Sequence, residues 1–124
     1  MRCENLDVWK RSCRLSVEIY KYFANFKDYG FKDQITRSSL SIPSNIAEGM
    51  EKDYTKEKKR FIEISKGSIA ELKTQIYIGI EIGYIAKDIG LDWIKRLNEI
   101  LKMLIGLLKY HNKTSKSWNL KSVT

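Results

Sequence analysis

A single proline inside a helix-forming stretch constrains this chain more than any other feature. The stretch Ile35 to Met50 reads I-T-R-S-S-L-S-I-P-S-N-I-A-E-G-M, and Pro43 is the only proline among 124 residues. A proline in a helix interior removes a backbone donor, clashes with the carbonyl four residues earlier and costs roughly 3 kcal/mol. It also disfavours helical dihedral angles at Ile42. We therefore expect a kinked central helix whose small side chains let other helices pack closely.

The composition favours an all-α domain. The chain has one Pro and seven Gly, with many Ile, Leu, Lys and Glu residues. A chain of this length buries about two-thirds of its unfolded surface, which is enough for one core. We predict a single domain over residues 1–112. The polar and basic residues 113–124 are expected to form a mobile tail.

Apolar periodicity predicts four helices with short connections. Their expected ranges are Leu6–Phe26, Phe31–Met50, Lys56–Tyr84 and Trp93–Tyr110. Thr55 and Asp92 are the expected N-caps of the last two helices. The isoleucines between positions 76 and 82 alternate as in a strand, but they follow a helical pattern without a turn signal. Four such helices predict an antiparallel up-down-up-down four-helix bundle with a proline-kinked second helix.

The first expected helix has two apolar rows. One comprises Leu6, Trp9, Cys13, Tyr20 and Ala24, and the other Val8, Leu15, Ile19, Tyr22 and Phe26. A helix that is apolar over more than half its circumference has more apolar surface than one edge of a small monomer needs. Either the bundle wraps this helix tightly, or one row faces the core and the other a neighbouring subunit. We favour the second interpretation. Cys13 is expected to be a buried thiol.

The third expected helix has an inward row with glycines beside it. The row comprises Phe61, Ile64, Ser68, Leu72, Ile76 and Gly79. Each glycine costs a helix up to about 1 kcal/mol relative to alanine. We therefore expect Gly67, Gly79 and Gly83 to serve close backbone approach.

Several polar residues fall near the small-residue contacts of the second and third helices. They are Asn45, Glu48, Ser68, Glu71 and Gln75. The favoured interpretation is a structural, hydrogen-bonded polar layer that holds the proline-containing helix, because buried polar groups need partners. The alternative is a small ligand or ion site inside the bundle.

The charge balance is strongly basic. The formal net charge is +8, and the segment from Leu101 to Thr124 holds five lysines and no acid. Such an excess either only aids solubility or indicates a polyanionic partner such as nucleic acid. Phosphate contacts would give salt-dependent, sequence-independent affinity. The candidate nucleic-acid-binding residues are Lys10, Arg11, Arg14, Lys21, Lys109, Lys113 and Lys116.

No catalytic or cofactor-binding constellation is visible in the sequence. His111 is the only histidine and is expected at an exposed helix end. The Glu-x-x-His pairs of di-iron bundles are absent, as are phosphate-binding glycine motifs. We therefore predict no enzyme activity, no metal and no cofactor. No apolar run reaches membrane-spanning length, so we expect a cytoplasmic protein without a membrane partner.

Four segments together resemble a known protein family. They are S-I-P-S-N-I-A-E-G (41–49), F-I-E-I-S-K-G-S-I-A-E-L-K-T-Q (61–75), L-D-V-W (6–9) and M-L-I-G-L-L-K (103–109). The chain is similar over residues 6–112 to the "four helix bundle protein" family, also called 23S ribosomal RNA intervening sequence proteins. Its residues Asn45, Glu48, Gly49, Ser68, Glu71 and Gln75 match signature positions of that family, and the resemblance implies no catalytic role for them.

The resemblance implies an antiparallel four-helix bundle that assembles as a homopentameric ring. Some family members are encoded within insertions in bacterial 23S rRNA genes. A related branch, the accessory variability proteins of diversity-generating retroelements, binds nucleic acid and a reverse transcriptase. The expected function is therefore that of a non-enzymatic, RNA-binding homo-oligomer. The alternative is a protein-interaction scaffold, such as a reverse-transcriptase accessory protein.

Overall fold

The computed structural model is an all-α four-helix bundle. It describes the backbone of residues 1–123 and the side chains of residues 1–113. The helices are α1 (Asp7–Tyr22), α2 (Tyr29–Met50), α3 (Thr55–Glu81) and α4 (Lys87–Val123). Within residues 1–123 there is no strand, so the predicted fold class is confirmed and the alternating isoleucines up to Ile80 are helical.

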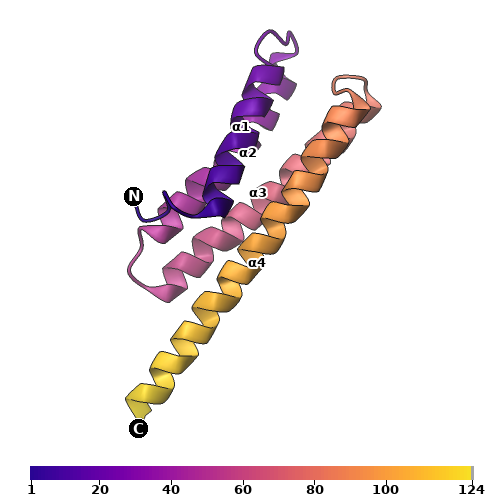
Figure 1. Cartoon of the computed structure of the whole chain (residues 1–124). Coiled ribbons are helices and arrows are strands. Elements are labelled where there is room, and N and C mark those ends of the chain that lie inside the picture. The colour runs from indigo at the N-terminus through magenta and orange to yellow at the C-terminus, as the bar shows by residue number, and fades with distance from the viewer. Residues whose placement is uncertain (124) are drawn as a thin grey trace.

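Each helix packs against two others. α2 and α4 each contact both α1 and α3, whereas α1 and α3 do not contact one another over the described residues. The α1–α2 and α3–α4 connections lie at one end of the molecule, and the α2–α3 connection lies towards the other (Figure 1). α4 continues past that connection. α1 and α3 therefore occupy diagonally opposite corners of the bundle.

Several predicted helix boundaries are wrong. α4 begins at Lys87 rather than Trp93, so Asp92 lies inside it. α3 begins at Thr55, and Tyr54 occupies the N-cap position without a side-chain bond. α3 ends at Glu81 because Gly83 has a φ of +79°, a left-handed conformation that suits glycine. α4 also continues beyond Tyr110 to Val123, while the predicted domain boundary at residue 112 and the mobility of the tail stay predictions.

The core uses one of the two apolar rows of α1. Val8, Leu15 and Ile19 are buried, whereas Tyr20 is exposed and Cys13 is only half-buried. The prediction of a buried Cys13 is therefore wrong. The reason is that α2 and α4 both approach α1 from the side of Leu15, so the other row touches the core only at its start, through Leu6 and Trp9.

The inward row of α3 is confirmed from Ser68 to Gly79, but its first two predicted members are wrong. Its buried residues are Ile62, Ser65, Ser68, Ile69, Leu72, Ile76 and Gly79. Phe61 is half-buried and Ile64 is 40% exposed, so placing both in the core was wrong. The buried row keeps helical spacing, but Ser65 interrupts its apolar pattern in the sequence.

α2 and α3 approach closely through small residues. The Ser65 hydroxyl donates to the Ile42 carbonyl at 2.9 Å, directly before Pro43. A Cβ atom added at Gly49 would lie 2.9 Å from the Cβ of Phe61 and 3.2 Å from the Lys58 carbonyl oxygen. α2 is assigned as one helix through the buried Pro43, and the expected kink stays a prediction.

Only one of the three glycines predicted to serve close approach does so. A Cβ atom at Gly79 would lie 2.5 Å from Cδ1 of Ile85, which packs directly on this glycine. At Gly67 nothing lies within 4 Å, and Gly83 is required for its backbone conformation instead. The spacing of the three glycines along the sequence could not show that one is packed against a side chain, one is open to solvent and one adopts a left-handed backbone conformation.

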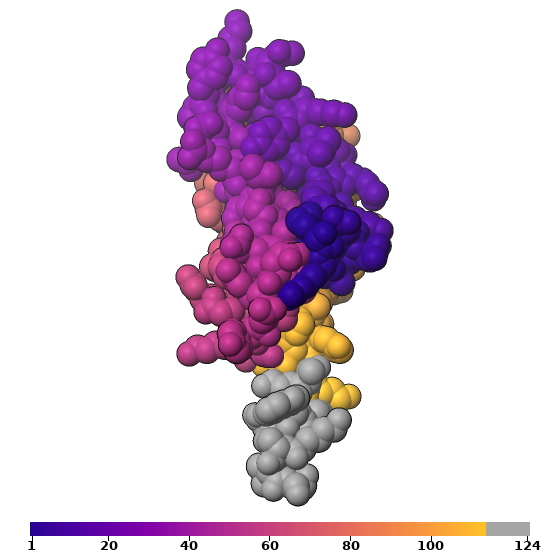
Figure 2. Space-filling model, turned by 90° about the vertical axis from the view of Figure 1, so that its left-hand side faces the viewer, coloured from indigo at the N-terminus to yellow at the C-terminus, as the bar shows by residue number. Residues whose placement is uncertain are grey.

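The N-terminal residues pack against the α2–α3 connection (Figure 2). The backbone amide of Arg2 donates to the Glu51 carboxylate at 2.7 Å. The guanidinium of Arg2 donates to the Lys52 carbonyl at 3.1 Å and to the Asp53 carboxylate at 3.0 Å. Cys3, next in the chain, is completely buried. Burial raises the pKa of its thiol.

The glycine contacts predict opposite effects for two alanine substitutions. Gly49→Ala should lower the free energy of unfolding by about 1–3 kcal/mol, because backbone and Cβ atoms block the new methyl group. Gly67→Ala should raise it by up to about 1 kcal/mol, since the site is open and alanine favours the helix. Urea denaturation followed by circular dichroism measures both. Equal effects at the two positions would contradict the close approach of α2 and α3.

Candidate nucleic-acid interface

Three of the predicted phosphate-binding residues lie on the outer face of α1. Lys10, Arg14 and Lys21 recur at four- and seven-residue steps, so they share a face with Val17. All four side chains are exposed, and none of the three cations pairs with an acid among the described residues. This face of α1 therefore has positive charge beside exposed apolar surface.

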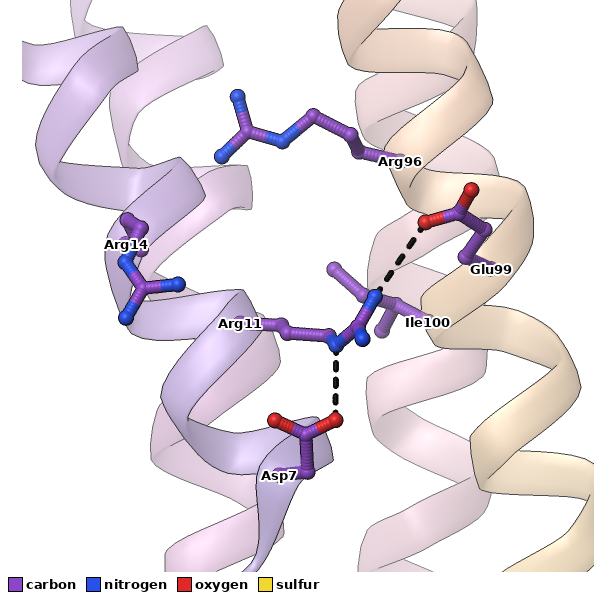
Figure 3. A pocket seen from close by; sticks show the side chains of 6 residues that line it. All are labelled: Asp7, Arg11, Arg14, Arg96, Glu99 and Ile100. Carbon is purple, nitrogen blue, oxygen red and sulfur yellow. Dashed lines mark hydrogen bonds and ion pairs between the residues drawn. The ribbon is translucent and has the colours of Figure 1, made fainter.

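Arg11, by contrast, belongs to an ion-pair network between α1 and α4 (Figure 3). Its guanidinium pairs with Asp7 at 2.9 Å and with Glu99 at 3.4 Å. Arg96 of α4 pairs with Glu18 of α1. Asp7, Arg11, Arg96 and Glu99 line a groove of about 320 Å³, which Arg14 also borders from α1. Because the acids neutralise much of this charge, the groove is a weaker phosphate site than the sequence indicated.

The second half of α4 has a stripe of lysines. Lys102, Lys109 and Lys113 are exposed and recur at seven- and four-residue steps, so they lie on one face of the helix. No acid occurs from Leu101 onwards. We call these three residues the α4 lysine stripe. The side chain of Lys116, also predicted to bind nucleic acid, lies outside the described residues.

The structure brings together two of the five residues predicted to form a polar layer. Asn45 donates to the carbonyl and hydroxyl oxygens of Ser41 at 2.8 and 3.0 Å, and the Ser41 and Ser68 hydroxyls are 2.8 Å apart. Ser41 joins the other two. It was missed because four serines lie between positions 38 and 44, and the sequence does not show which of them faces α3.

The other three predicted members lie elsewhere. Glu48 pairs with Lys52 at 3.5 Å, and Glu71 is exposed beside a shallow hollow that Ser41 and Ser68 also line. The buried Oε1 atom of Gln75 has no hydrogen-bond partner among residues 1–113. Within the described part of the chain, no cluster of three or more His, Cys, Asp or Glu side chains could hold a metal ion.

His111 is not the exposed helix-end residue that the sequence predicted. It lies within α4, is half-buried, and its buried Nε2 atom has no partner among the described residues. Burial lowers the pKa of the imidazole, and the positive charge of Lys58 lowers it further.

The fold and its charged surfaces define a basic four-helix bundle. The chain belongs to the family of 23S rRNA-intervening sequence proteins, whose model matches residues 4–106. A similar solved structure is that of a protein of unknown function from the S23 ribosomal protein family of Bacteroides thetaiotaomicron. The two chains are 26% identical, the match covers 82% of this chain and 98% of the other, and the TM-score is 0.77. No curated protein matches this chain. No helix in the described residues has the length and apolarity needed to cross a bilayer.

The environment of His111 predicts how this residue titrates. Its pKa should lie below 6.5 in the folded protein and should rise in Lys58→Met, because that substitution removes a nearby positive charge. Folding then disfavours the protonated imidazole, so this residue lowers stability as the pH falls through 6.5 towards the folded-state pKa. NMR titration of the imidazole protons measures both. Lys59→Met is the matched control and should leave the His111 pKa unchanged.

Proposed function

We propose that this protein is a non-enzymatic, cytoplasmic homo-oligomer that binds nucleic acid, RNA above all, through the α4 lysine stripe. The observation that carries this proposal is the alignment of Lys102, Lys109 and Lys113 on one exposed face. That face belongs to the longest helix, in a half that has no acid. The family's name, which refers to 23S rRNA, supports RNA as the nucleic acid.

The stripe suits the phosphate backbone better than base edges. Lysine ammonium groups act as mobile point charges, and neutralising phosphates releases counterions. Sequence-specific RNA binding instead uses aromatic side chains that stack on splayed bases. Between Lys102 and Lys109 this face has Ile105 and Gly106, and the exposed aromatic residue next to the stripe, Tyr110, has its ring against that of His111. We therefore propose binding that depends on charge and RNA shape.

Self-association would strengthen such binding. Each copy supplies one stripe, and linking several stripes raises the effective concentration at every further contact. The resemblance to the family predicts a ring of five copies, and we adopt a ring as part of the proposed function. Several linked copies could then bind RNA tightly even if the three lysines of one copy bind it only weakly.

A second candidate function is that of a protein-interaction scaffold, with a reverse transcriptase as one partner. It is favoured by a groove of about 430 Å³ between α1 and α2, lined mainly by apolar side chains including Val17, Tyr20 and Leu40. A partner protein that co-purifies after nuclease treatment would favour this alternative over RNA binding.

The experiment is fluorescence anisotropy with a labelled RNA hairpin over a salt series. Replacing Lys102, Lys109 and Lys113 together by glutamine should weaken binding. It should also reduce the magnitude of the slope of log K against log salt by about 2–3, at roughly 0.7–0.9 per lost phosphate contact. The measurement compares this variant with the unchanged protein at equal oligomer concentration.

The matched control replaces three exposed lysines outside the stripe. Lys27, Lys56 and Lys87 to glutamine changes the net charge by the same amount, and Lys87 lies on the same helix. This control should keep most of the salt slope. Equal losses in the two triple variants would show that net charge alone drives binding, and affinity that is insensitive to salt would reject the proposal.

A further inference from the structure

A small polar hollow lies along the seam between α2 and α3. Its volume is about 280 Å³, and it is lined by Gln34, Arg37, Ser38, Ser41, Ser68 and Glu71. Sites for drug-sized ligands span roughly 300–1,000 Å³, so an occupant of this hollow has to be small. Every lining residue has a polar or charged side chain, unlike the apolar groove between α1 and α2. We call this site the α2/α3 hollow.

Contacts between α2 and α3 define how the two helices face each other along this seam. Gly49 lies against Phe61, and the Ser41 and Ser68 hydroxyls are 2.8 Å apart. Residue numbers on α2 therefore fall as those on α3 rise. One helical turn beyond the serine pair, this register places positions 38 and 71 opposite each other, and two turns beyond, positions 34 and 75. The hollow thus follows a row of facing polar side chains.

Several polar groups of the hollow have no partner within the protein. Ser38 is only 5% exposed, yet its hydroxyl makes no hydrogen bond among residues 1–113. The exposed side chains of Gln34 and Glu71 likewise have neither a hydrogen bond nor an ion pair over those residues. Buried hydroxyls in folded proteins are nearly always bonded, because burying an unpaired polar group is unfavourable. The hollow therefore presents a buried hydroxyl and a free carboxylate to a ligand.

Gln75 adds an unsatisfied acceptor at the end of this row. Its side chain is half-buried, and its Oε1 atom is buried without a partner in the described part of the chain. The register places Gln75 across from Gln34, whose exposed side chain lines the hollow. A ligand donor that displaces the Gln34 side chain would reach this acceptor and satisfy it.

The hollow has one free negative charge and one weakly paired positive charge. Glu71 has no cation partner over residues 1–113, whereas Arg37 pairs with Asp33 of its own helix at 3.5 Å. The Arg37 and Asp33 side chains are 78% and 69% exposed, so their ion pair is weak and the guanidinium is free to bind another carboxylate. Guanidinium groups bind carboxylates in a bidentate manner, and carboxylates accept strong hydrogen bonds from ammonium groups. A ligand with both an ammonium and a carboxylate group matches both side chains.

We propose that the α2/α3 hollow binds a small zwitterionic ligand, a free α-amino acid. The ammonium group of the ligand bonds to the Glu71 carboxylate and the Ser38 hydroxyl, and its carboxylate bonds to the Arg37 guanidinium. This site uses none of the residues of the α4 lysine stripe. It is therefore a second binding activity, which stands or falls independently of RNA binding.

Two other classes of ligand match the hollow less well. A metal ion would meet a single carboxylate, and residues 1–113 hold no group of three or more His, Cys, Asp or Glu side chains suited to a metal. A phosphate would face the Glu71 carboxylate, with Arg37 as the cation among the lining residues. Both classes leave one of the two charged side chains opposed or unused.

NMR titration of isotope-labelled protein with a panel of the free L-amino acids tests the site. At least one amino acid should shift the backbone amide signals of the residues around the hollow in a saturable manner. Its carboxyamide and its N-acetyl derivative, which lack one charge each, should bind at least tenfold more weakly. A panel in which no amino acid shifts these signals would overturn the proposal. Equal binding of the carboxyamide would contradict the contact with Arg37.

Charge-neutralising variants identify the two side chains that bind the ligand. Glu71→Gln and Arg37→Gln should each weaken binding at least tenfold, and the thermal midpoint without ligand should stay unchanged because both side chains are exposed. The matched controls are Glu81→Gln, at an exposed acid of α3, and Arg60→Gln, at an exposed arginine that also pairs within its own helix at 3.5 Å. Both controls should bind as the unchanged protein does. Equal losses in variants and controls would contradict the assigned contacts.

Ser38→Ala distinguishes a ligand-binding hydroxyl from one that the fold requires. This variant should weaken binding without lowering the thermal midpoint of the free protein, because no bond within the protein is lost and alanine favours the helix. Ser65→Ala removes the bond to the Ile42 carbonyl and should lower the midpoint. A Ser38→Ala variant that loses as much stability as Ser65→Ala would assign the Ser38 hydroxyl to the fold and overturn its role in the site.

Discussion

The close contact between α2 and α3 is the interaction on which the other helices depend. Gly49 leaves no room for a side chain against Phe61, and the Ser65 hydroxyl bonds the backbone of α2 beside Pro43. Small residues make this approach possible, and hydrogen bonds satisfy the polar groups that it buries. α1 and α4 then pack onto a pair whose spacing is already determined, so a larger residue in this contact would displace all four helices.

The charged side chains fall into two kinds of region, one in which cations pair with acids and one in which cations have no acid partner among the described residues. Between α1 and α4, arginines and acids neutralise one another in partly exposed ion pairs such as Arg11–Glu99, which stabilise the fold only weakly. Exposed cations without an acid partner among the described residues include the group on the outer face of α1 and the α4 lysine stripe, and others such as Lys27, Lys56 and Lys87 are scattered elsewhere. Both groups lie next to exposed apolar side chains, Val17 on α1 and Ile105 on α4.

Local spacing was enough to predict the four helices and the buried residues Ser68, Leu72, Ile76 and Gly79 of α3, because these follow from the helical period. Spacing did not show which of the two apolar rows of α1 faces the core, and it missed Ser65, which looks polar until its acceptor on α2 is known. The start of α4 was missed because Lys87 to Gly90 has the composition of a turn. The pairing of Ser41 with Ser68, and the opposite placement of α1 and α3, require the tertiary arrangement.

The two cysteines differ in a way that has a practical use. Cys3 is completely buried behind the bonds that Arg2 makes to the α2–α3 connection, whereas Cys13 lines the open apolar groove between α1 and α2. Burial raises the pKa of both thiols, but only Cys13 is partly open to solvent. A maleimide dye should therefore modify Cys13 first in the native protein. The fluorophore would then stand in the apolar groove between α1 and α2, so the folded chain already contains a single labelling position for reporting what enters this groove.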